Sequence, residues 1–93
     1  MDYSDDLLSK IQDLSRDLTP PQEMAALLDL DESELRTDIN TPGNPARRAF
    51  MKGYAETALH LRRQNLELAD AGSPAADEAC RMYLKRMTRD IDL

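Results

Sequence analysis

Apolar and polar positions recur with a helical period along this whole chain. Over residues 4–18 the apolar side chains fall on one face, which predicts a first packing helix with apolar positions Leu7, Ile11, Leu14 and Leu18. A longer helix is predicted over residues 45–71, with the apolar stripe Phe50, Tyr54, Ala58, Leu61 and Leu68. No stretch alternates with the period of two that is typical of a strand. The pattern therefore predicts an all-α fold with five helices.

Residues 19–39 predict two short helices joined by a tight turn. Thr19 is a suitable N-cap for the first helix, and Asp31 is a suitable N-cap for the second. Ala25 offers a small side chain where two helices could cross, and Leu35 offers an apolar one inside the second helix. Asp29 occupies the turn position that often holds glycine. This spacing is typical of a helix-turn-helix, predicted here over residues 19–40.

Proline and glycine mark the remaining helix ends. Asn44 can cap the long helix, with a proline at its first position, and Ser73 can cap a last helix over residues 73–91. Gly72 is a suitable C-terminal cap for the long helix. The short link at Gly72 predicts that the last two helices fold back as a long antiparallel hairpin. The 93 residues are expected to form a single domain.

The chain has a net charge of −6, and its charged residues are unevenly distributed along the sequence. Residues 20–41 hold six acidic groups and one basic group, whereas residues 42–69 hold five basic and two acidic groups. The basic field thus follows the helix-turn-helix instead of lying on it. The start of the chain lacks the basic and apolar regions of a signal peptide, and no apolar run is long enough to cross a membrane. A single cysteine excludes an intramolecular disulfide framework, so we expect a cytoplasmic protein.

Catalytic and metal-binding chemistry has few candidate residues. His60 lies on the polar face of the long helix, and Cys80 lies on the apolar face of the last helix. Neither has an acid, base or nucleophile arranged at a useful spacing, and no cluster has metal-ligand spacing. We therefore expect no enzymatic activity, no cofactor and no metal.

The order of these parts is similar to that of a known family. The segments LTPPQEMAALLDLDESEL and NLELADAGSPAADEACRMYLKRM, within residues 18–88, resemble small terminase subunits of phages. The resemblance implies a helix-turn-helix that binds a viral packaging site and a hairpin that drives ring-like oligomers. It also implies that the protein regulates a separate, large motor ATPase. Residues 32–37 would be the recognition helix, and residues 54–84 would form the assembly surface.

Two functional hypotheses follow from these patterns. In the first, the chain is an oligomeric DNA-binding adaptor whose DNA contacts come from Ser33, Arg36, Thr37, Arg47, Arg48 and Lys52. Self-assembly would then use the side chains Tyr54, Leu61, Leu68, Tyr83 and Met87. The alternative is a protein-interaction module that does not bind DNA. Its acidic surface would bind a basic partner through Glu32, Glu34 and Asp38.

Overall fold

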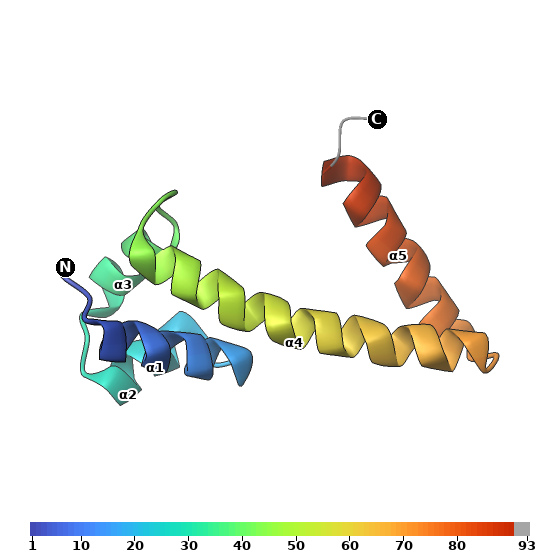
Figure 1. The fold of residues 1–93 in the computed structure, drawn as a ribbon, viewed down its shortest axis with the longest axis horizontal. Coiled ribbons are helices and arrows are strands. Elements are labelled where there is room, and N and C mark those ends of the chain that lie inside the picture. The colour runs from blue at the N-terminus through green and yellow to red at the C-terminus, as the bar shows by residue number, and fades with distance from the viewer. Residues whose placement is uncertain (91–93) are drawn as a thin grey trace. The chain divides into compact units, whose positions relative to one another are not determined.

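The computed structural model describes residues 1–90 as five α-helices (Figure 1). They are α1 (Asp5–Arg16), α2 (Pro21–Leu28), α3 (Glu32–Ile39), α4 (Pro45–Asp70) and α5 (Pro74–Asp90). No strand occurs in these residues, so the predicted all-α fold with five helices is confirmed. The last helix was predicted to reach residue 91, which lies outside the described residues.

The chain divides into two compact units. Unit 1 comprises Met1–Thr57, and unit 2 begins at Ala58, so the division falls inside α4. Unit 1 therefore contains α1, α2, α3 and the first half of α4. Unit 2 contains the second half of α4 together with α5.

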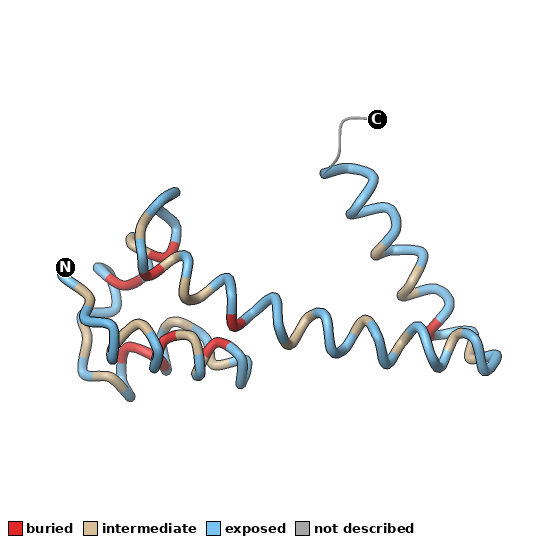
Figure 2. The backbone as a smooth tube through the Cα atoms, viewed as in Figure 1, coloured by how far each residue is buried: buried red, intermediate tan, exposed pale blue. Residues whose placement is uncertain are grey.

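The hydrophobic core of unit 1 is small and is made of aliphatic side chains. Ile11, Met24 and Leu35 are fully buried, and the same cluster includes Ala25, Ile39 and Ala46 (Figure 2). Helices α2 and α3 pack directly against each other. Ala25 and Leu35 both lie in this cluster, as the predicted crossing of the two short helices requires.

A glycine brings α1 and α4 very close together. A Cβ atom added to Gly53 would lie 2.1 Å from the backbone oxygen of Gln12 and 2.9 Å from the backbone nitrogen of Arg16. The Ser15 hydroxyl donates to the Phe50 carbonyl oxygen at 2.5 Å. Because a glycine inside a helix costs stability, its presence here is explained by the room that the crossing needs. Gly53 was not among the positions expected to matter for packing.

Polar contacts continue the α1–α4 crossing at the surface. The Arg16 guanidinium pairs with Glu56 at 2.6 Å, and Gln12 donates to the same carboxylate at 3.0 Å. The hydrogen bond from Arg16 lowers the pKa of Glu56 below its ordinary value. The Thr57 hydroxyl also donates to the backbone carbonyl of Arg16. These contacts fix the position of α1 along the first half of α4.

Most of the predicted helix caps are confirmed. Asp31 accepts a hydrogen bond from the Glu34 backbone N–H at 2.8 Å, and Asn44 accepts one from the Ala46 N–H at 2.9 Å. Ser73 accepts an equivalent bond at the start of α5, and Ser4 accepts one at the start of α1. Gly72 has a φ of 98°, the left-handed conformation expected after the last turn of α4.

The predicted end of the first helix is wrong by about half a turn. Helix α1 ends at Arg16, and Leu18 lies beyond it, mostly exposed and with a φ of 63°. The Leu18 N–H donates to the Ser15 carbonyl, and the Thr19 N–H donates to the Leu14 carbonyl, each at 3.0 Å. This pair of bonds is a Schellman motif with leucine at the position that usually holds glycine. Leu18 therefore ends the helix and does not contribute to its apolar face.

Helix α2 begins one residue later than predicted. Pro20 is its N-cap residue, no side chain caps it, and Pro21 is its first residue. Thr19 consequently does not cap α2. Asp29 adopts the left-handed conformation, with a φ of 55°, and so performs the turn expected at that position.

Unit 2 consists of two helices with little buried surface between them. The second half of α4 and α5 are joined by residues 71–73, and they diverge from this turn (Figure 1). Within residues 58–90, Ala76 is the only buried side chain. Between the two arms, the Asn65 side chain donates to the Tyr83 hydroxyl at 2.9 Å. The predicted hairpin connection is present, but its arms separate instead of packing along their length.

Candidate functional site

The first turn of α3 is acidic and exposed. Glu32, Ser33 and Glu34 begin the helix, and all three are exposed to solvent. Arg36, the one basic residue of this helix, pairs with Glu32 at 3.4 Å across one turn. The Thr37 hydroxyl donates to the Ser33 carbonyl at 3.0 Å. The helix therefore presents carboxylates first, with Arg36 and Thr37 one turn later.

The N-terminal residues lie against α3 and occupy two of its carboxylates. The amino group of Met1 pairs with Glu34 at 3.1 Å, and the Tyr3 hydroxyl donates to Asp38 at 2.5 Å. The hydrogen bond to Glu34 raises the pKa of the Met1 amine. Burial, followed by the hydrogen bond to Asp38, raises the pKa of Tyr3. These contacts were not predicted from the sequence, because they join residues more than thirty positions apart.

The basic residues at the start of α4 have two different environments. Arg47 is half-buried, and its Nη1 donates to the Ile39 carbonyl at 2.9 Å. Since Ile39 is the last residue of α3, Arg47 satisfies a carbonyl at the negative end of that helix. Arg48 and Lys52, in contrast, are exposed. The structure thus gives Arg47 a structural contact and leaves Arg48 and Lys52 accessible to a polyanion.

The predicted assembly residues are mostly exposed. Tyr54 on unit 1 and Leu61, Leu68 and Met87 on unit 2 are all classed as exposed, with Met87 63% exposed. Tyr83 is half-buried, and its hydroxyl accepts the hydrogen bond from Asn65. Four of these five residues therefore have apolar surface that their own unit does not cover.

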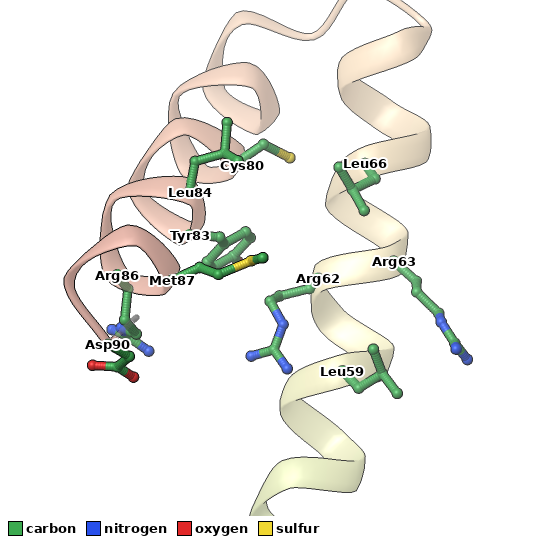
Figure 3. A pocket seen from close by; sticks show the side chains of 10 residues that line it. All are labelled: Leu59, Arg62, Arg63, Leu66, Cys80, Tyr83, Leu84, Arg86, Met87 and Asp90. Atoms are coloured by element: carbon green, nitrogen blue, oxygen red, sulfur yellow. The ribbon is translucent and has the colours of Figure 1, made fainter. Parts of the chain in front are cut away.

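A groove lies in unit 2 between the second half of α4 and α5 (Figure 3). It has a volume of about 460 Å³, and its apolar lining is Leu59, Leu66, Cys80, Tyr83, Leu84 and Met87. Its charged lining is Arg62, Arg63, Arg86 and Asp90. Of these residues, Tyr83 and Met87 were predicted from the sequence to take part in assembly. Leu59 and Leu66 are seven positions apart, a helical spacing that could have indicated this second face.

Chemical groups suited to catalysis do not converge in the described part of the chain. His60 is exposed, and its Nε2 atom lies 3.2 Å from the side-chain nitrogen of Gln64. Cys80 is half-buried and lines the groove. Among residues 1–90, no group of three or more histidine, cysteine or acidic side chains is placed to hold a metal ion. The helices of these same residues include none with the length and apolar character needed to cross a bilayer.

Comparisons with protein families, with curated proteins and with solved structures found no match to this chain.

Proposed function

We propose that this protein is a non-enzymatic, oligomeric DNA-binding adaptor of the phage small-terminase type, acting in the cytoplasm. Helices α2 and α3 would form its DNA-binding element, and exposed apolar side chains of unit 2 would join copies. In the family it resembles, such an adaptor binds a packaging site and regulates a motor ATPase. The observation that carries the proposal is the pair of short helices built around Ala25 and Leu35, followed directly by a basic helix start.

The charges indicate how this element would contact DNA. The carboxylates in the first turn of α3 oppose insertion of this turn into a DNA groove, because the flanking phosphates carry a dense negative charge. The contacts of α3 with DNA would therefore come mainly from Arg36 and Thr37, one turn after these carboxylates. Arg48 and Lys52, both exposed, would neutralise phosphates and set the position of the protein on the duplex.

Charge reversal of these two basic residues tests the DNA contact. The double variant Arg48→Glu/Lys52→Glu should bind a labelled duplex at least about tenfold more weakly at low salt, since two phosphate contacts are lost. Lys85→Glu/Arg89→Glu on exposed positions of α5 is the matched control, because it changes the net charge by the same amount. Fluorescence anisotropy would measure both affinities. Equal weakening by the two variants, or no binding by the wild type at low salt, would contradict the proposal.

Unit 2 supports the assembly part of the proposal. A two-helix segment of fewer than about 40 residues rarely forms a stable core alone, and only Ala76 is buried within residues 58–90. Leu61 and Leu68 lie seven positions apart on α4 and are 44% and 54% exposed. Association of copies would remove this apolar surface from water.

Light scattering tests the assembly directly. The wild type should have a mass several times that of one chain, and Leu61→Ser/Leu68→Ser should lower that mass. Because both side chains are exposed in the single chain, the variant should keep its helical circular dichroism. A wild type with the mass of one chain at micromolar concentration would exclude this part of the proposal.

A second function is favoured by one observation, the exposed carboxylates at the start of α3. An acidic helix-turn-helix surface is suited to a basic protein partner and not to DNA. Glu32→Gln separates the two functions, because Glu32 is paired only within α3, with Arg36, whereas Glu34 and Asp38 also hold residues 1–3 in place. A DNA-binding protein should bind DNA more tightly after this change. A module for a basic partner should lose partner affinity and still show no DNA affinity.

A further inference from the structure

The two units differ in charge as well as in structure. Residues 1–57 contain twelve acidic and six basic residues, whereas residues 58–93 contain six of each. Unit 1 therefore carries all of the net charge of −6. The groove of unit 2, in contrast, is lined by three arginines and one aspartate. A basic, apolar groove and an acidic unit are thus present in the same chain.

Unit 1 exposes one large apolar side chain on an acidic helix. Leu27 of α2 is 66% exposed, the largest value among the exposed hydrophobic residues described. Glu23 precedes it by one helical turn, and Ala26 is its neighbour; both are exposed. The opposite side of α2 is buried through Met24 and Ala25. We call the surface of Glu23, Ala26 and Leu27 the α2 ridge.

We propose that the α2 ridge of one copy docks into the unit 2 groove of a second copy. Leu27 would fill the apolar part of the groove, which includes Leu59 and Leu66, and Glu23 would lie near its arginines. Figure 3 shows Arg62 extending toward the space between the two helices, and Arg86 beside Asp90 on α5. A volume of about 460 Å³ accommodates a leucine and the neighbouring side chains of a helix.

Charge favours this pairing over a pairing of two grooves. Joining two copies groove to groove would bring Arg62 and Arg86 of both copies together, and like charges in an interface disfavour association. The α2 ridge instead brings the carboxylate of Glu23 to the same arginines. Because ridge and groove are different surfaces, each copy can bind two neighbours, which leads to a ring or an open chain. The inference rests on the assembly part of the proposed function and adds a contact distinct from Leu61 and Leu68.

Reciprocal charge reversal in the full chain tests the contact. The groove variant Arg62→Glu/Arg86→Glu and the ridge variant Glu23→Lys/Ala26→Lys should each weaken self-association about tenfold or more in sedimentation velocity. An equal mixture of the two variants should recover association, because each acidic surface again meets a basic one. Weakening by the groove variant alone, or no recovery in the mixture, would overturn the inference.

A neutral pair of variants provides the control. Leu27→Ser removes the proposed docking side chain, and Met82→Ser removes an equally exposed apolar side chain, 64% exposed, that does not line the groove. Only Leu27→Ser should weaken association. If Leu61→Ser/Leu68→Ser lowers the mass but Leu27→Ser does not, copies assemble as proposed and the ridge contact is wrong. A monomeric wild type would overturn both the proposed assembly and the ridge contact. The DNA-binding part of the proposed function is measured independently of these two.

Discussion

Replacing Gly53 by alanine should destabilise unit 1, although the same change in most helices is stabilising. In an exposed helix interior, Gly→Ala stabilises by about 1 kcal/mol, because alanine restricts the unfolded chain and is the best helix former. At Gly53 the new Cβ would lie 2.1 Å from the Gln12 backbone oxygen, where ordinary van der Waals contact begins at 3.4 Å. The clash involves backbone atoms, so no side-chain rotation relieves it. Helix α1 must move away from α4 by more than an ångström.

The cost of that movement follows from what the crossing holds together. Separation weakens the hydrogen bond from Ser15 to the Phe50 carbonyl and the contact of Thr57 with the Arg16 carbonyl. Each such bond contributes about 1 kcal/mol net. Packing of Ile11 is also disturbed, and overpacking alone typically costs about 1–3 kcal/mol. After subtracting the gain in helix propensity, we expect a net loss of about 2 kcal/mol.

Thermal and urea unfolding followed by circular dichroism would measure this loss. For a domain of this size, a loss of about 2 kcal/mol lowers the midpoint temperature by roughly 10 °C. Ala55→Gly at an exposed position two residues later is the matched control, and it should cost about 1 kcal/mol through helix propensity alone. The sign of the Gly53→Ala effect is decisive. A variant as stable as the wild type, or more stable, would refute the close crossing of α1 and α4.

Three further changes test other parts of unit 1. Leu18→Gly should raise the free energy of unfolding, measured by urea titration, by about 1 kcal/mol, because glycine adopts a φ of 63° without the steric cost that leucine incurs. A loss of stability in this variant would contradict the Schellman assignment. Leu35→Ala should lower the same free energy by about 2–5 kcal/mol, since the side chain is fully buried; an effect below about 1 kcal/mol would place Leu35 outside the core. Arg16 lowers the pKa of Glu56, so this pair stabilises the folded state above the ordinary carboxyl pKa of 4.5 and loses that effect as pH falls through the lower folded pKa. Glu56→Gln should therefore be less stable than the wild type at pH 7 and nearly equal to it at acid pH, and a difference that does not depend on pH would exclude the ion pair as its cause.

Local signals in the sequence were sufficient to predict most helix ends. Asp31, Asn44, Ser73 and Gly72 act where they were expected, because capping depends on a few neighbouring residues. The exception is the region of Leu18, where leucine occupies a left-handed position that sequence statistics assign to glycine.

The packing faces of α4 could be predicted only in part. The apolar stripe through Phe50, Tyr54 and Leu61 suggested one continuous face, but α1 crosses α4 at Gly53, where the smallest side chain permits the closest approach. Tyr54 in unit 1 and Leu61 in unit 2 both remain exposed. Hydrophobic periodicity gives most weight to large apolar residues and therefore overlooks a contact made through a glycine. The groove of unit 2 was anticipated only through Tyr83 and Met87, and its arginines and its lining residues on α4 were not singled out.

The candidate DNA-binding residues illustrate what tertiary contacts add. Charge and position in the sequence grouped Arg47 with Arg48, yet Arg47 binds the end of α3 through the Ile39 carbonyl. The carboxylates of Glu34 and Asp38 are occupied by Met1 and Tyr3, which lie more than thirty positions earlier in the sequence. Such long-range pairs leave no periodic signal, so only the structure separates basic residues that are exposed from those that are engaged.

The most direct test of the proposed function is the salt dependence of DNA binding by the full chain. Anisotropy of a labelled duplex would be titrated at about 50 mM and about 200 mM salt, because the logarithm of the affinity falls linearly with the logarithm of the salt concentration. Phosphate contacts from Arg48 and Lys52, with Arg36 as a third, predict that a plot of the logarithm of the association constant against the logarithm of the salt concentration has a slope of about −2 to −3. Measurable binding at low salt with this slope is the predicted result. No binding at the lower salt concentration, or an affinity that does not change with salt, would contradict the proposal that α3 and the start of α4 bind DNA.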